Sequence, residues 1–143
     1  MKVEQLSVFL ENKSGRLTEA TEVLADGGVN IRALSLADTA DFGILRLIVN
    51  DPEKARAILK AGGFTAAVTE VLAIEVPDRP GGLAGILKQF SVAGINVEYL
   101  YAFVAKSGEN AIIICRFENS DAAMAALEKE GIRILDGADI SAL

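Results

Sequence analysis

The residues best suited to bind a ligand lie in two short turns, each of which precedes a predicted helix. The first turn reads Asn12-Lys13-Ser14-Gly15-Arg16, and the second reads Asp78-Arg79-Pro80-Gly81-Gly82. The first amides of a helix have no intrahelical acceptor, and the helix dipole favours negative charge there. Glycine also lets a ligand come close to the backbone. Each turn therefore suits an anion such as the carboxylate of an amino acid.

An asparagine follows each turn, at the start of the next predicted strand. Asn30 lies in the motif Gly-Val-Asn-Ile, and Asn96 lies in Gly-Ile-Asn-Val. A side-chain amide supplies two donors and one acceptor, so it can bind both an ammonium and a carboxylate. A structural interpretation is also open, in which Asn12 and Asp78 cap helices while Asn30 and Asn96 fix the entry into a strand.

The composition argues against an enzyme. Histidine is absent, so the usual Ser-His and Cys-His arrangements and ordinary zinc sites cannot form. The single cysteine, Cys115, ends an Ile-Ile-Ile-Cys run, which favours a packed and inert thiol. No EF-hand spacing, phosphate-loop lysine motif or dinucleotide-binding glycine pattern is present. We therefore expect no catalytic residue, no metal and no cofactor.

Charge and hydropathy exclude two classes of partner. Fourteen basic residues face twenty acidic ones, which gives a net charge of -6 and opposes the attraction that nucleic-acid binding needs. The apolar runs, such as residues 111–115, are too short to span a bilayer. Glu4 and Gln5 precede any apolar stretch, so we expect no secretory signal and a cytoplasmic protein.

The chain is an internal duplication. Gly15 corresponds to Gly81 at a displacement of 66 (81 − 15), and Leu59 corresponds to Leu127 at 68 (127 − 59). Two residues have therefore been added in the second copy, and we place them in the hairpin around residues 106–110. Repeats of this length indicate one supersecondary unit per copy. We predict one domain over residues 1–70 and another over residues 71–143.

Each copy is predicted to run strand, helix, strand, strand, helix, strand. Helical spacing begins at Leu17, and Asp51-Pro52 is a typical helix opening. A second-copy helix should open near Asn119. Such a βαββαβ unit, with both helices on one face of an antiparallel sheet, is the ferredoxin-like architecture of the α+β class. The predicted strands of the first copy cover residues 3–10, 30–37, 42–49 and 65–71, with a polar turn at 38–41.

Both faces of the second sheet are apolar, so both need cover. We expect the faces without helices to pack on each other or on a second subunit, and hence a homodimer. No Pro/Gly/Ser linker separates the strand ending at residue 71 from the next one, which begins there and runs to 76, so rigid coupling of the copies is expected. One predicted face carries Val97, Tyr99, Tyr101 and Phe103, and the other carries Leu100, Ala102 and Val104.

The repeated motifs resemble those of ACT domains, a family of amino-acid-binding regulatory domains. The segment 10–17 with Gly-Val-Asn-Ile is similar to the regulatory domain of phosphoglycerate dehydrogenase and the small subunit of acetolactate synthase. Ser14 replaces the proline of the family pattern, whereas Pro80 keeps it. The resemblance spans nearly the whole chain twice and implies an amino acid bound between ACT units by the loop of one and a strand of another. The implied ligand-binding residues are Asn12, Ser14, Gly15, Arg16, Leu17, Asn30, Ile31, Asp78, Arg79, Pro80, Gly81, Gly82, Leu83, Asn96 and Val97.

The leading hypothesis is a free-standing, non-catalytic amino-acid sensor with unequal sites, because Asp78 stands where the first copy has Asn12. One alternative is a regulatory subunit that binds a catalytic enzyme such as acetolactate synthase. Two further alternatives are a small acylphosphatase-like enzyme, which would pair Arg16 with Asn30 or Arg79 with Asn96, and a purely structural assembly module.

Overall fold

A computed structural model describes residues 2–38 and 41–143 and divides the chain into two compact units. We call residues 4–69 the first unit, and residues 70–143 with the N-terminal segment up to Val3 the second unit. The centre of the predicted polar turn at 38–41, Thr39 and Ala40, lies outside the described residues.

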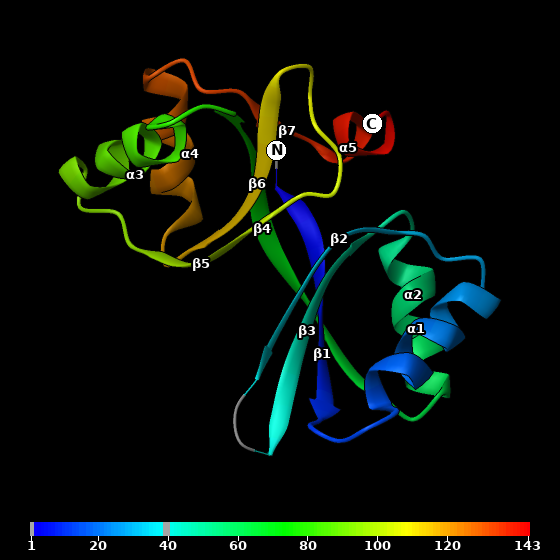
Figure 1. The fold of residues 1–143 in the computed structure, drawn as a ribbon. Helices are drawn as coiled ribbons and strands as arrows, with labels where there is room; N and C mark the ends of the chain where they lie inside the picture. Colours follow the sequence, from blue (N-terminus) through cyan, green and yellow to red (C-terminus); the bar gives the residue numbers. More distant parts are fainter. Residues whose placement is uncertain (1, 39–40) are drawn as a thin grey trace. The chain divides into compact units, whose positions relative to one another are not determined.

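In the first unit, two helices cover one face of a four-stranded sheet (Figure 1). The strand order is β2-β3-β1-β4, and β3 is antiparallel to both β1 and β2. Leu6, Leu45 and Leu59 are fully buried between helices and sheet. The predicted opening of α2 is confirmed, because Asp51 caps the helix and Pro52 begins it. The elements are β1 (Val3–Glu11), α1 (Arg16–Asp26), β2 (Ile31–Asp38), β3 (Phe42–Val49), α2 (Pro52–Ala61) and the start of β4 (Thr65–Pro77).

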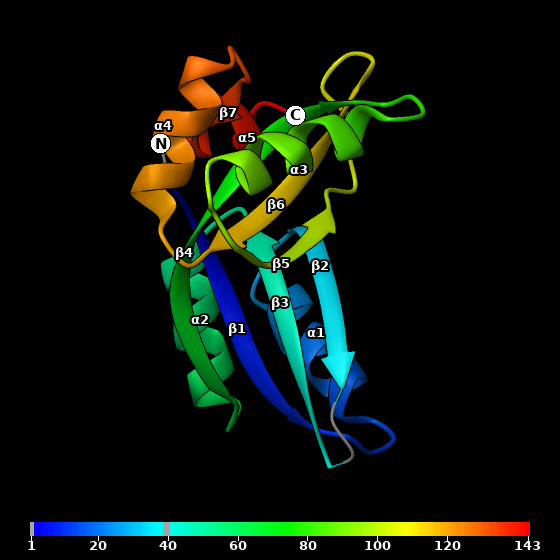
Figure 2. The ribbon, with the colours of Figure 1, turned by 90° about the vertical axis from the view of Figure 1, so that its left-hand side faces the viewer.

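The second unit repeats this topology. Its strand order β5-β6-β4-β7 corresponds to β2-β3-β1-β4, which confirms the ferredoxin-like α+β prediction. Helices α3 and α4 cover one face of its sheet, and the short helix α5 lies on the other side (Figures 1 and 2). After β4 come α3 (Gly82–Val92), β5 (Val97–Ala102), β6 (Asn110–Phe117), α4 (Ser120–Lys129), β7 (Ile134–Leu135) and α5 (Gly137–Ser141).

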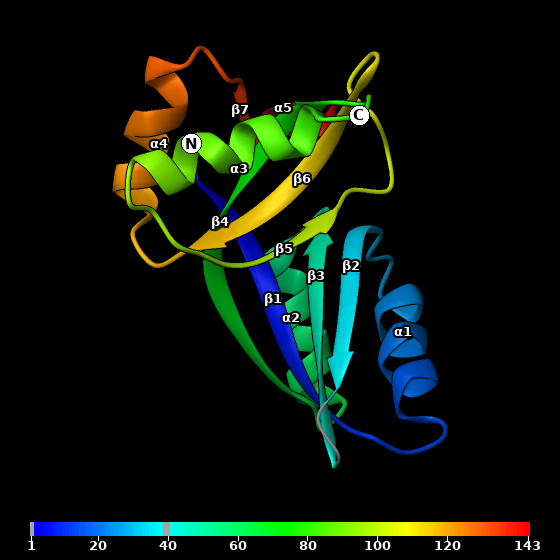
Figure 3. The same ribbon diagram turned by 60° about the vertical axis from the view of Figure 1, so that its left-hand side comes forward.

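Strand β4 serves both repeats, as its course in Figure 3 shows. The sequence predicts two strands that meet at Val71, whereas the structure has one unbroken strand of 13 residues. From Leu72 to Pro77 this strand pairs with β6. Because no turn residue interrupts it, the last strand of one repeat becomes the first strand of the next. The expected rigid coupling and the packing of the helix-free faces stay predictions.

A β-bulge corrects one sequence prediction. Strand alternation predicts Val97 on the same face as Tyr99 and Tyr101, but the pairing register shifts between Val97 and Tyr99. Val97 pairs with Phe117 and packs against the helix-facing core, whereas Tyr99 pairs with Arg116. The extra residue of a bulge reverses the alternation of side chains along a strand, and sequence alternation alone cannot reveal it.

Candidate functional site

The loop that joins β1 to α1 is anchored by its backbone. The amide of Asn12 donates to the carbonyl of Asp41 at 2.9 Å, and Gly15 adopts φ 92°, which favours glycine. Lys13 hydrogen-bonds Glu11 and lowers the pKa of that carboxyl group. A small pocket of about 70 Å³ lies between this loop and the edge of β2, and it is lined by Leu10, Glu11, Asn12, Lys13, Leu17, Leu36, Asp38 and Gly43.

Helices α1 and α3 leave their second and third amides free, whereas their first amides donate to carbonyl groups of the preceding loops. Among the described residues, they are the two helices without a side-chain cap, whereas α2, α4 and α5 each begin at a side chain that accepts an amide hydrogen bond. The N-cap residues are Gly15 and Gly81, so the interpretation of Asn12 and Asp78 as helix caps is wrong. Free amides are therefore present at both predicted loops, at Leu17 and Thr18 and again at Leu83 and Ala84.

The β4–α3 loop of the second unit differs in charge from the β1–α1 loop of the first unit. Asp78 forms an ion pair with Lys106, which lies in the connection between β5 and β6. The two residues added to the second copy lie here, because β2 and β5 begin 66 residues apart (97 − 31), whereas β3 and β6 begin 68 residues apart (110 − 42). The chain itself therefore supplies the cation that pairs with Asp78, which is the ammonium group of Lys106.

Asn30 and Asn96 begin their strands through their backbones. The amide of Asn30 donates to Oδ1 of Asn50 at 2.9 Å, and its carbonyl accepts from the amide of Asn50 at 3.2 Å. The carbonyl of Asn96 accepts from the amide of Glu118 at 3.3 Å, and Asn96 borders a pocket of about 750 Å³. Both asparagine residues are exposed, so these backbone roles leave their side-chain amides accessible.

The structure does not bring the loop and the asparagine of one unit together. Asn12 follows the end of β1, which pairs with Phe42, whereas Asn30 precedes the start of β2, which pairs with Val49. Seven residues of β3 separate these points (49 − 42), which is about 23 Å of strand. The second unit repeats this separation along β6. One small amino acid cannot contact both groups of the same unit.

Arg16 is engaged inside the first unit. Its guanidinium lies 4.5 Å from the ring centroid of Phe64, Nη1 contacts Glu19 at 2.6 Å, and Nε lies 3.8 Å from Glu11. These partners make it a packing residue. Because Arg16 begins α1, it also lies far from Asn30, and the acylphosphatase-like pairing of these two residues is absent from the unit.

The remaining predicted residues fall into two groups. Ser14 and Pro80 are exposed in their loops. Ile31, Leu83 and Val97 are partly buried and pack against the two helix-facing cores.

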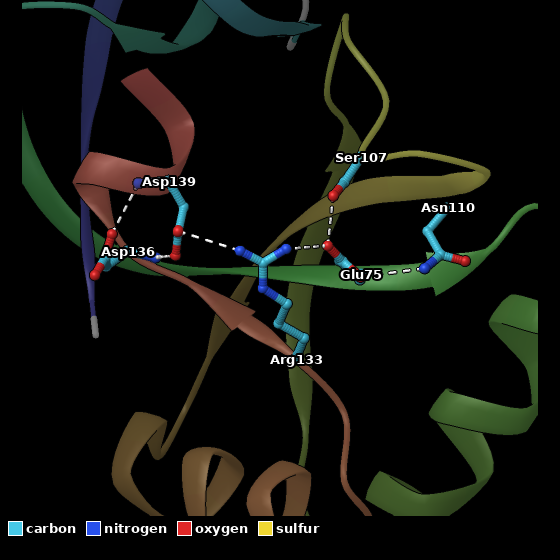
Figure 4. Close-up of polar contacts among 6 residues, drawn as sticks. All are labelled: Glu75, Ser107, Asn110, Arg133, Asp136 and Asp139. Atoms are coloured by element: carbon cyan, nitrogen blue, oxygen red, sulfur yellow. Dashed lines mark hydrogen bonds and ion pairs between the residues drawn. The ribbon is translucent and has the colours of Figure 1, made fainter. Parts of the chain in front are cut away.

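A polar cluster in the second unit escaped the sequence prediction (Figure 4). The carboxylate of Glu75, only 14% exposed, accepts bonds from Ser107 at 2.5 Å, Asn110 at 3.1 Å and Arg133 at 2.7 Å. The Ser107 hydroxyl and then Asn110 and Arg133 hold the pKa of Glu75 below its usual value, although burial opposes them. Arg133 also reaches Asp139 of α5 at 3.2 Å, so the cluster ties β4, the β5–β6 connection and α5 together.

The sequence profile of one family, described as the ACT domain pair, matches residues 1–143. The chain belongs to this family. Comparison with curated proteins gave no match.

Solved structures share the fold of this ACT domain pair. Protein BT0572 from Bacteroides thetaiotaomicron is 44% identical with a TM-score of 0.92, and the match covers 100% of this chain and 98% of that one. The ligand-free regulatory subunit of aspartate kinase from Thermus thermophilus is 16% identical, with a TM-score of 0.62 and 88% and 91% coverage. Aspartate kinase from Synechocystis is 19% identical, with a TM-score of 0.60, and the match covers 89% of this chain but 25% of that enzyme.

Three further observations concern membrane-spanning helices, metal ligands and the cysteine. Within residues 2–38 and 41–143, no helix combines the length and apolarity needed to cross a membrane. The same residues hold no group of three or more metal-ligating His, Cys, Asp or Glu side chains. Burial raises the pKa of the Cys115 thiol to about 12, so this thiol is protonated at neutral pH.

Proposed function

We propose that this ACT domain pair is a non-catalytic regulator that binds a free amino acid at the β1–α1 loop. The uncapped N-terminus of α1 carries the proposal, since α2 of the same unit begins at a capping side chain, as do α4 and α5. The amides of Leu17 and Thr18 are free to receive a carboxylate. The same geometry at α3 supports a second, weaker loop site, because Asp78 adds a negative charge there.

The proposed site is completed by a second copy of the chain. Asn12 and Asn30 lie at opposite ends of β2, so two β2 edges paired antiparallel would bring Asn12 of one copy beside Asn30 of the other. β2 ends the strand order on its side of the sheet, and Leu34 and Leu36 on it are 46% and 51% exposed. An unpaired edge with apolar side chains favours such pairing. We therefore propose a homodimer.

In this arrangement the ligand would link the two copies. The carboxylate would bind the α1 amides, and the ammonium would bind the side-chain oxygens of Asn12 and of the second copy's Asn30. A ligand held by both copies binds the dimer better than the monomer, so it strengthens association by mass action. A change in dimer stability is the signal that such a regulator could pass to an enzyme.

Thermal unfolding of the full chain with each proteinogenic amino acid, followed by calorimetric titration of any hit, tests the proposal. We expect one amino acid to raise the unfolding temperature and to strengthen dimerisation in sedimentation experiments. Asn12→Ala or Asn30→Ala should weaken its binding about tenfold or more. Glu22→Ala, at an exposed position of α1, is the matched control and should bind normally. Unchanged affinity in the double asparagine variant would show that the site is assigned wrongly, and no response to any amino acid would refute the function.

A further inference from the structure

The second unit contains a cavity that the first unit has filled. The cavity measures about 470 Å³ and lies between the start of α3 and the turn from α4 to β7. Gly85 and Ile86 of α3 line one side, and Ile132 lines the other. Arg79, Glu130 and Glu75 bring charged groups to its border. The α1–β2 turn, the β2 edge and Asn96 take no part in it.

The duplication explains why space is left here. Arg16 of the first unit corresponds to Gly82 (82 − 16 = 66), and Glu19 corresponds to Gly85 (85 − 19 = 66). In the first unit, the guanidinium of Arg16 lies over the Phe64 ring and pairs with Glu19.

In the second unit, glycines replace both members of that ion pair, and Ile132 stands in the place of Phe64 (132 − 64 = 68). A methyl group added at Gly85 would meet no atom within 4 Å. The second repeat has therefore exchanged a packed ion pair for open volume beside the helix.

Two opposite charges at this cavity have no partner within the described residues. Neither Arg79 nor Glu130 forms a side-chain hydrogen bond or ion pair there. Glu75, by contrast, is satisfied by Ser107, Asn110 and Arg133. The free groups at the border are thus one guanidinium and one carboxylate, while Ile86 and Ile132 form apolar walls.

We propose that this cavity, beside the α3 loop, is a further ligand site, which takes a free α-amino acid with an aliphatic side chain. Arg79 binds its carboxylate, Glu130 binds its ammonium, and the side chain lies over Gly85 between the two isoleucines. A guanidinium is well suited to a carboxylate because it offers parallel donors. Only the class of ligand in this proposal rests on the proposed function. The site itself lies within one unit and needs no second copy.

The test is titration of the ¹⁵N-labelled full chain with each aliphatic amino acid, read by NMR at the amides of Gly85 and Gly131. We expect saturable shifts at both amides, and Arg79→Gln and Glu130→Gln should each weaken binding about tenfold. Gly85→Leu fills the cavity and should abolish the shifts at Gly131. Lys88→Leu places the same side chain at an exposed position of α3 that does not line the cavity, so it is the matched control and should bind within about threefold of the wild type.

The loop-site proposal and the cavity proposal can be refuted independently of each other. If no aliphatic amino acid shifts the Gly85 and Gly131 amides, or if Gly85→Leu binds as the wild type does, the cavity proposal is overturned. Asn12→Ala should leave cavity binding unchanged, and loss of cavity binding in that variant would also overturn it. Loop binding that depends on Asn12 and Asn30 would persist in Gly85→Leu whatever happens at the cavity.

Discussion

Replacing Gly82 by alanine is the sharpest test of how α3 meets its sheet. Gly82 is buried at the first position of α3, and an added Cβ would lie 2.0 Å from the carbonyl oxygen of Pro77 and 3.0 Å from its carbonyl carbon. Both are backbone atoms of β4, which cannot rotate away as a side chain can. The start of α3, and with it the free amides of Leu83 and Ala84, would have to move.

The expected cost follows from this overlap. Forcing an extra carbon into a packed site typically costs about 1–3 kcal/mol. A change of 1 kcal/mol shifts the melting temperature of a chain of this size by roughly 3 °C, so Gly82→Ala should melt roughly 3–9 °C lower. Gly85→Ala, three residues along the same helix, meets nothing within 4 Å and should gain about 1 kcal/mol, because glycine is a poor helix former.

Thermal and urea unfolding of both variants, with helix content followed by circular dichroism, measures the contrast. Equal stability of the two variants, or a Gly82→Ala protein more stable than the wild type, would refute the described contact between α3 and β4. The sequence by itself favours the opposite expectation, because the first repeat carries an arginine at the position that corresponds to Gly82.

Further predictions concern the two cores, pH and the thiol. Leu59→Ala and Leu127→Ala, at matching buried positions of the two repeats, should each lower the unfolding free energy by about 2–5 kcal/mol in urea titrations, and a loss below about 1 kcal/mol would contradict their burial. Because the folded pKa of Glu75 is lowered from 4.5, its stabilising contribution is complete above that pH and is lost as the pH falls through the folded pKa. Glu75→Gln should therefore be less stable at pH 7 and should lose less stability than the wild type on acidification below about pH 4.5; parallel profiles would exclude this role. The Cys115 thiol should resist Ellman's reagent in the folded protein and react after denaturation, and rapid native labelling would contradict its burial.

Local sequence determined the elements because their signals are local. Asp51-Pro52 and Asn119 act locally, because each side-chain oxygen accepts a hydrogen bond from an amide in the first turn of its helix and proline suits the first helical position. The repeated spacing indicates the duplication and its inserted hairpin. The absence of histidine narrows the possible chemistry through composition alone, because it removes a residue type that no fold can replace.

Features that depend on pairing between distant strands could not be predicted. The bulge that turns Val97 toward the helices, and the fusion of two predicted strands into β4, are set by register. Glu75 had no local sequence signal because its partners Ser107, Asn110 and Arg133 lie 32 to 58 residues away. The departure from repeat symmetry was the available clue, since Glu75 corresponds to Phe9 (75 − 66 = 9).

The candidate sites, too, depend partly on local sequence and partly on tertiary structure. The sequence alone identified the two turns, because a glycine before a helix and a nearby asparagine are short-range patterns. Only the structure decided that Asn12 and Asn30 lie at opposite ends of a strand and that a cavity adjoins Gly85. It also decided that the N-cap residues are Gly15 and Gly81 rather than Asn12 and Asp78. The physical reason is that strand direction and packed volume are properties of the assembled sheet, so they are not encoded in any one segment.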